Sequence, residues 1–444
     1  MFPCFRGWLP GAPAVLLLLS SGCGGQTPPA ASRPAVDAAA ERYVRLALGL
    51  GERDADSIDS YHGPSQWQAD AGARHAPLPK IRADATLLAD SLAAAAAPDA
   101  PRDDNVRRAF LVRQLRAIAA RVDILLGARP SFDDETRSLF GLEGQAGGDG
   151  DAAAVRAEIA KLLPGSGSLP ARYAAFDRQY LIAPDRLNAV LSRAADGCRA
   201  ATAPHVSLPA GERIVIEYAN DLAWSAFTRY EGRATSRIRV NAALPLTVDR
   251  ALDLACHEAY PGHHTIDSLL DAEAGRRVEL LVRPLFSPQS ALHEAAASLA
   301  SSVAFADPER IAFERDELFP LAGLDPSGAG VHVRVGRLID RLSSAQASIA
   351  RQYLDGALDF PRAAAALERD ALMPSADATL KFLNQFRSYA ATYTLGRERL
   401  RRHLDAKAPP CGDKNVRWRA YVDAVTDPAQ ILPPERAVDS KIWR

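Results

Sequence analysis

Residues 257–264 read HEAYPGHH and bring together side chains that bind metal ions and a carboxylate that can accept a proton. Two histidines bind one ion from a single helix face when they are four residues apart. The fourth residue after His257 is Pro261. In a straight helix His257 and His264 are about 10.5 Å apart along the axis, too far for two bonds of about 2.1 Å to one ion. A regular helix therefore cannot form a metal site from this segment.

The pair Pro261-Gly262 predicts a local distortion of this helix. Proline removes a backbone hydrogen-bond donor, and glycine permits almost any backbone dihedral. A bulge that absorbs two extra residues brings His263 to the place that the second histidine normally occupies. His264 is then rotated by about 100° and points behind the ligands or toward substrate. A bulge one residue longer makes His264 the ligand instead.

A later segment offers a third ligand. A catalytic Zn²⁺ site uses three protein ligands and keeps one position open, and His-His-Glu is a standard set. Glu294 follows the motif on a predicted helix, and His293 beside it either supports a ligand, replaces one or is solvated. Glu258, next to His257, is placed to act as a general base. The sequence therefore predicts zinc bound by His257, His263 and Glu294.

The whole segment resembles the HExxPGHH signature of the bacterial family called domain of unknown function 885, which is grouped with the gluzincin metallopeptidases. LHEAAAS at 292–298 is also similar to the HES-type motif of thermostable carboxypeptidases, and Tyr393 to Gly396 matches a late Y..G segment. The resemblance spans residues 205–403. It implies a gluzincin-like fold with Glu258 as the base and Tyr393 as a hydrogen-bond donor to the oxyanion.

The third-ligand helix departs from that family. The family usually has Glu-Gly-Trp followed by an aromatic and an acidic residue, whereas this chain has Glu294-Ala-Ala-Ala-Ser298. The absence of these aromatic residues changes the expected shape of the substrate cleft more than it changes the expected metal site.

The predicted function is the hydrolysis of peptide bonds by metal-activated water with a glutamate general base, as in a carboxypeptidase or dipeptidase. A different class is the alternative: a non-catalytic envelope lipoprotein with a degenerate metallopeptidase scaffold. Tyr393 also fits a core aromatic stripe with Tyr389 and Phe386. Arg397 and Arg401 share its helix face at four-residue steps, so either one is a candidate to hold a substrate carboxylate or is solvated.

Strand patterns precede the motif at 213–219, 224–232 and 235–244, with a turn at Glu231-Gly232. Most of the remaining chain has apolar residues at three- and four-residue spacing, which predicts helices. The fold class predicted is mainly α: a helical bundle with a small antiparallel β-sheet next to the active-site helix, in a single domain over 36–444. Residues 235–241 are predicted both as an amphipathic strand and as the edge strand that holds an extended peptide.

The first 23 residues have the order of parts of a lipoprotein signal peptide, ending in Ser-Ser-Gly-Cys23. Lipidation of Cys23, with 24–35 as a flexible tether, predicts a bacterial envelope protein anchored on the periplasmic face of the outer membrane; secretion without lipid is the alternative. The formal net charge of −1 predicts no nucleic-acid partner. The expected partners are a peptide substrate and the membrane.

Export also places the cysteines in an oxidising compartment. Cys198 and Cys411 lie in polar, turn-like sequences and are a possible disulfide pair. Cys256 lies in an apolar helical pattern and is predicted to be a small core residue.

Overall fold

Apolar residues at helical spacing bury one face of most helices in this protein, and the segments of mixed composition between them form the turns. The computed structural model describes residues 35–95, 101–143, 149–220, 224–374, 376–409 and 412–427. The predicted signal peptide, Cys23 and the tether up to residue 34 lie outside the described residues, as does Cys411. No helix in the described part of the chain has the length and apolar character needed to cross a membrane.

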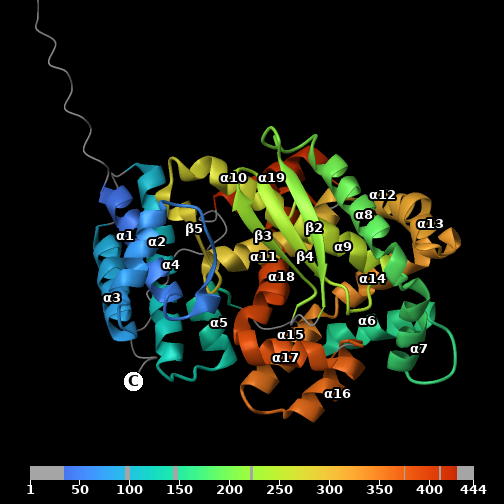
Figure 1. The fold of residues 1–444 in the computed structure, drawn as a ribbon. Coiled ribbons are helices and arrows are strands. Elements are labelled where there is room, and N and C mark those ends of the chain that lie inside the picture. Colours follow the sequence, from blue (N-terminus) through green and yellow to red (C-terminus); the bar gives the residue numbers. More distant parts are fainter. Residues whose placement is uncertain are drawn as a thin grey trace, which may run out of the picture. The chain divides into compact units, whose positions relative to one another are not determined.

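Helices make up most of the described chain (Figure 1). Their bounds are α1 Ala35–Gly51, α2 Ser65–Arg74, α3 Leu78–Ala94, α4 Arg102–Leu125, α5 Phe132–Phe140, α6 Asp149–Leu162, α7 Leu169–Asp177, α8 Leu187–Thr202, α9 Val248–Glu258, α10 His263–Ala274, α11 Pro288–Ala304, α12 Asp307–Phe313, α13 Phe319–Ala322, α14 Ala329–Asp340, α15 Ser343–Leu354, α16 Phe360–Asp370, α17 Ala376–Phe386, α18 Arg397–Lys407 and α19 Lys414–Thr426. The predicted fold class, mainly α with a small sheet, is confirmed.

The three predicted strands form one sheet beside α9 and α10 (Figure 1). Its order is β2 (Arg213–Ala219), β4 (Thr235–Asn241), β3 (Ala226–Gly232). β3 and β4 form the expected antiparallel hairpin, and β2 adds to β4 in parallel. The assignment of 235–241 as an edge strand is wrong, because β4 pairs on both sides. β3 is the edge strand that borders the site.

A second, two-stranded sheet was not predicted from the sequence. β1 (Ile58–Tyr61) pairs antiparallel with β5 (Val282–Pro284), and a bulge interrupts the register between Ile58 and Ser60. Strands this short carry too little alternation for a sequence pattern to detect. Asp59 lies at this bulge.

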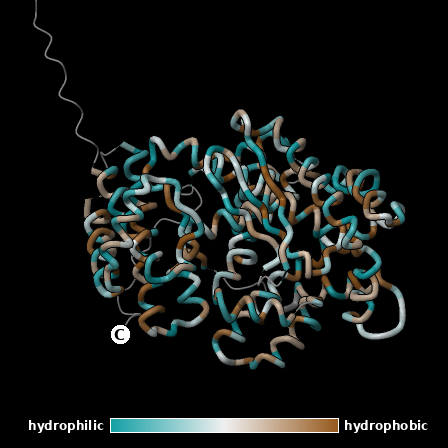
Figure 2. The backbone as a smooth tube through the Cα atoms, in the orientation of Figure 1, coloured by the Kyte–Doolittle hydropathy of each residue, from teal (hydrophilic) through white to brown (hydrophobic). Residues whose placement is uncertain are grey.

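Hydrophobic and hydrophilic residues alternate along the helices (Figure 2), and α11 is an exception because it is buried on nearly all sides. Fourteen of its seventeen residues are buried, many of them alanines. Small side chains let neighbouring helices approach closely, and α9, α18 and α19 all contact α11. The helix that carries Glu294 is therefore the central element of the core around the site.

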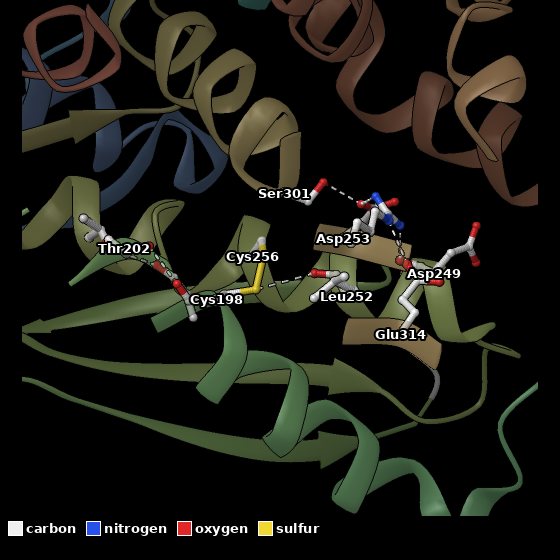
Figure 3. The surroundings of a disulfide bond; sticks show 11 residues. Cys198, Thr202, Asp249, Leu252, Asp253, Cys256, Ser301 and Glu314 are labelled. Carbon is white, nitrogen blue, oxygen red and sulfur yellow. Dashed lines mark hydrogen bonds and ion pairs between the residues drawn. A yellow bond between two sulfur atoms is a disulfide. The ribbon is translucent and has the colours of Figure 1, made fainter. Parts of the chain in front are cut away.

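A disulfide joins Cys198 in α8 to Cys256 in α9, with a Cα–Cα distance of 5.4 Å (Figure 3). Both cysteines are fully buried. The predicted pairing of Cys198 with Cys411 is therefore wrong. The prediction of Cys256 as a small core residue is confirmed, and its disulfide with Cys198 was not foreseen. The polar neighbours of Cys198 suggested a turn, but they form the exposed face of α8, and the cysteine lies on the face that packs against α9.

We predict that the double variant Cys198→Ala, Cys256→Ala loses about 2–4 kcal/mol of unfolding free energy, because the cross-link no longer restricts the unfolded chain. Urea denaturation of the oxidised protein measures the difference. Cys411→Ser is the matched control and should leave the unfolding curve unchanged. Equal loss of stability in the control would show that Cys411 takes part in the pairing.

Candidate metal centre and active site

The helix that carries His257 is interrupted between Glu258 and His263. α9 ends at Glu258 and α10 begins at His263, with a cis peptide bond at Tyr260-Pro261 between them. A Cβ atom on Gly262 would lie 1.8 Å from the carbonyl oxygen of His257, so only glycine fits there. The distortion expected from Pro261-Gly262 is thus a break between two helices and not a bulge within one.

This break brings the side chains of His257, His263 and Glu294 together. The Nε2 atoms of the two histidines are 3.2 Å apart. The Nε2 of His257 lies 3.5 Å from Oε2 of Glu294, and the Nε2 of His263 lies 3.5 Å from Oε1 of Glu294. Tetrahedral bonds of about 2.1 Å place neighbouring ligand atoms about 3.4 Å apart. The spacing and the His-His-Glu chemistry of the donors therefore fit a zinc ion, and the buried Oε2 of Glu294 has no hydrogen-bond partner among the described residues.

The electrostatics of the three residues agree with this fit. Burial alone would raise the pKa of Glu294, but His263 and His257 outweigh it and hold the pKa well below its usual range. Burial opposes the charged form of His263, yet Glu294 raises the pKa of this histidine to about 10. Glu294 is therefore ionised and stabilises the protonated form of His263. A metal ion would replace the proton on His263.

Glu258 is held by the edge strand of the sheet. The Thr228 hydroxyl lies 2.6 Å from Oε2 of Glu258 and 2.9 Å from its backbone carbonyl. Both residues are buried, and both line the cavity in front of the metal ligands. The sequence did not point to Thr228, because its role depends on how β3 packs against the end of α9.

Tyr393 and Tyr389 lie on the side of the site formed by the segment after α17. Tyr393 lines the cavity, with its ring centroid 6.3 Å from that of His257. Burial, followed by Glu294, raises the pKa of Tyr393 well above its usual value, so its hydroxyl is a donor. The Tyr389 hydroxyl donates to Oε1 of Glu294 at 2.8 Å. The sequence pattern predicts Tyr389 only as part of a core aromatic stripe, because its contact with Glu294 depends on how the segment after α17 packs against α11.

The Y..G spacing has a packing reason as well. A Cβ on Gly396 would lie 3.3 Å from the carbonyl oxygen of Ala291 and 3.5 Å from the Cβ of Ala295. Glycine thus lets the segment that carries Tyr393 approach α11 closely.

His264 is not among the metal donors and does not line the cavity. It is fully buried, its Nδ1 lies 2.8 Å from the Ser236 hydroxyl, and its Nε2 lies 3.1 Å from Glu212. His264 therefore attaches α10 to the sheet, and of the two expected positions, behind the ligands or toward substrate, the structure does not support the one toward substrate. Because α10 begins at His263, His263 and His264 are consecutive helical residues, and their side chains point about 100° apart around the helix axis.

His293 does line the cavity, although it is not one of the three donors. Only 8% of its surface is exposed, and its Nε2 has no partner among the described residues. Burial, followed by Arg283, lowers the pKa of His293 to about 3.

The arginines considered for substrate binding lie elsewhere. Arg397 pairs with Asp340, and Arg401 pairs with Glu398 and Asp405. Neither lines the cavity. The expectation that one of them holds a substrate carboxylate is therefore wrong, because side chains at four-residue spacing share a helix face without necessarily facing the site.

The cavity has a volume of about 250 Å³ and three kinds of wall. The edge strand β3 supplies one, and aromatic rings of α17 and the following segment supply another. β1, β5 and α11 form the third, which contains Asp59 and Arg283. Asp59 is solvent-exposed where it lines the cavity, and partial desolvation by the cavity walls, followed by the nearby Asp267, raises the pKa of its carboxyl above the usual value.

α9 is joined to its neighbours by polar contacts around Asp253 (Figure 3). Asp253 accepts hydrogen bonds from the Ser301 hydroxyl of α11 at 2.6 Å and from Arg310 at 2.7 Å. Arg310 also binds Glu314 at 2.7 Å. Together with the disulfide at Cys256, this buried network fixes the helix that presents His257 and Glu258.

Comparisons with known proteins give distant structural likenesses. No family model matches the sequence, and a search of curated proteins finds no similar one. A solved structure of a candidate lipoprotein from Colwellia psychrerythraea has a TM-score of 0.49 at 16% identity over 89% of this chain and 75% of that one. A candidate lipoprotein of unknown function from Shewanella oneidensis has a TM-score of 0.43 at 13% identity over 82% of this chain and 75% of that one.

A third solved structure is an M32 carboxypeptidase from Deinococcus radiodurans R1, with a TM-score of 0.43 at 18% identity over 88% of each chain. All three TM-scores lie below 0.5. The chemistry of the site is therefore inferred from its own residues.

We predict that His263→Ala abolishes zinc binding and that His264→Ala retains it. His263 supplies one of three donors, whereas His264 only joins α10 to the sheet, so its loss lowers the melting temperature without removing a ligand. Zinc titration of the two purified variants, with melting curves, measures both effects. Loss of zinc from His264→Ala in a folded protein would contradict the assignment.

Proposed function

We propose that this protein is a zinc-dependent peptidase that hydrolyses peptide bonds with Glu258 as general base. The observation that carries the proposal is the position of Glu258 next to the His257, His263 and Glu294 donor set, on the wall of one cavity. A metal site that only stabilises the fold does not require a carboxylate such as that of Glu258 beside its ligands. When bound, zinc supplies Lewis-acid polarisation of a carbonyl oxygen and lowers the pKa of water.

Glu258 accepts the proton of the attacking water in this proposal. The hydrogen bond from Thr228 occupies Oε2 and holds the carboxylate in one orientation, so that Oε1 remains to receive the proton. Glu258 then delivers this proton to the leaving amine. The buried position of both residues keeps this orientation fixed throughout the reaction.

Tyr393 donates a hydrogen bond to the oxygen on which negative charge develops. The half-buried phenol stays protonated at neutral pH because its pKa is raised, so it can donate throughout the reaction. Tyr389 holds Glu294 through the 2.8 Å hydrogen bond and so orients a metal ligand.

The substrate is proposed to lie along β3. Ala226, Phe227 and Thr228 line the cavity, and β3 lies at the edge of its sheet, where it pairs with β4 alone among the described strands. An edge strand offers backbone N–H and C=O groups to an extended peptide. Side chains from the aromatic wall then contact the peptide residues near the scissile bond.

We predict that Glu258→Gln retains zinc and loses about 10²- to 10⁴-fold in hydrolysis, because the amide keeps the shape of the carboxylate but accepts no proton. Turnover of a mixed peptide library, followed by mass spectrometry, gives the rate, and metal analysis gives the zinc content. Treatment of the parent protein with a chelator should abolish the same activity. Absence of zinc, or of hydrolysis in the zinc-loaded parent, would favour the non-catalytic envelope lipoprotein.

We also propose that Cys23 carries a lipid that anchors the protein to the periplasmic face of the bacterial outer membrane. The support is the Ser-Ser-Gly-Cys23 segment after an apolar run. Cys23→Ser should release the protein from membranes into the soluble fraction, measured by membrane fractionation after a salt wash. A variant that remains with the membranes would show that Cys23 is not the anchor.

A further inference from the structure

The wall formed by β1, β5 and α11 presents an acidic side chain that no part of the proposed chemistry uses. Asp59 occupies the bulge between Ile58 and Ser60, and it lines the cavity. Bulges near active sites commonly re-aim a side chain. Asp59 lines the same cavity as the donors His263 and Glu294.

The charges on the described cavity walls are mainly negative. Five carboxylates line the cavity: Asp56, Asp59, Glu258, Asp267 and Glu294. Among the described lining residues Arg283 is the sole arginine or lysine, and its Nε already donates to Asp267 at 3.1 Å. Glu258 and Glu294 face the metal, so Asp56 and Asp59 remain as acidic groups without an assigned partner.

Two further features of the walls suit a cation. The unpartnered Nε2 of His293, in a side chain that is only 8% exposed, can accept a hydrogen bond from an N–H group. The rings of Trp224, Phe382 and Phe386 also line the cavity. Aromatic faces attract an ammonium group, most strongly where water is excluded.

We propose that this wall binds a primary ammonium group of the substrate, with Asp59 as its charged partner. The proposal rests on the peptidase function proposed above and specifies its substrate class: a peptide that presents its amino terminus or a lysine side chain next to the scissile bond. A substrate carboxylate is disfavoured, because Arg283 is paired with Asp267 and the surrounding charges would repel it.

Binding of small probes to the zinc-loaded Glu258→Gln protein tests the proposal without requiring hydrolysis. Phenylalaninamide carries an ammonium and no carboxylate, whereas N-acetylphenylalanine carries a carboxylate and no ammonium. Nα-acetyl-lysinamide presents the ammonium on a side chain. Calorimetric titration should show phenylalaninamide, Nα-acetyl-lysinamide or both binding at least about 10-fold more tightly than N-acetylphenylalanine, the size expected for a hydrogen bond to a charged group.

The variant Asp59→Asn in the same background should lose about 10- to 100-fold in affinity for the ammonium probe. Asp84→Asn is the matched control, since Asp84 pairs with Lys80 on α3 and does not line the cavity. Tighter binding of N-acetylphenylalanine, or an unchanged preference in folded, zinc-loaded Asp59→Asn, would overturn the proposal. If Asp59→Asn does not fold, the preference of the Glu258→Gln protein among the probes decides the question.

The two proposals fail in different ways. A parent protein that hydrolyses peptides but binds the acidic probe more tightly retains the peptidase function and loses the ammonium site. A protein that prefers the ammonium probes through Asp59 but hydrolyses no peptide retains the site and loses the peptidase function.

Discussion

Two imidazole nitrogens and a carboxylate are held within 3.5 Å of one another by three separate stretches of backbone, and this concentration of donor atoms is the constraint on which the site depends. When donor atoms are held this close together in a partly buried site, a positive charge among them stabilises the arrangement. Glu294 is kept ionised by its histidine neighbours, and His263 holds a proton strongly in return. A metal ion satisfies the same requirement with better geometry.

The scaffold around the donors acts mainly to resist movement. α9 is joined to α8 by the disulfide and to α11 and Arg310 through Asp253, so the helix that carries His257 is held by neighbouring elements through covalent and polar contacts. α10 is attached to the sheet through His264 and its contacts with Ser236 and Glu212. The alanines of α11 let the surrounding helices pack closely around Glu294. Each donor is therefore positioned by a different set of contacts, and the break at Pro261-Gly262 is stable because both helices that it joins are anchored.

The cavity walls differ in chemistry because they come from parts of the chain with different patterns. β3 offers backbone groups, the segment after α17 offers aromatic rings, and the β1–β5 pair offers Asp59 and Arg283. Arg283 and Asp267 largely neutralise each other, which leaves Asp59 as the distinctive charge of its wall. A substrate bound in this cavity would contact both Asp59 and the aromatic wall, although these lie more than two hundred residues apart in the sequence.

The sequence by itself determined the helical class, the three strands before the motif, and the candidate donors, because helical periodicity and the spacing of histidines around a Pro-Gly pair are local properties. The sequence favoured His263 as the second histidine on the assumption of a two-residue bulge and left His264 as the alternative, whereas the break between α9 and α10 is what brings His263 into the donor set. The tertiary structure alone decided which residues surround those donors. Thr228 and Asp59 reach the cavity through strand packing and a bulge, and Cys198 meets Cys256 because α8 lies against α9. The same holds for the arginines after Tyr393, which share a helix face in sequence and yet pair with Asp340, Glu398 and Asp405 away from the cavity. Contacts between elements far apart along the chain depend on how whole helices and strands pack, and no local pattern encodes that packing.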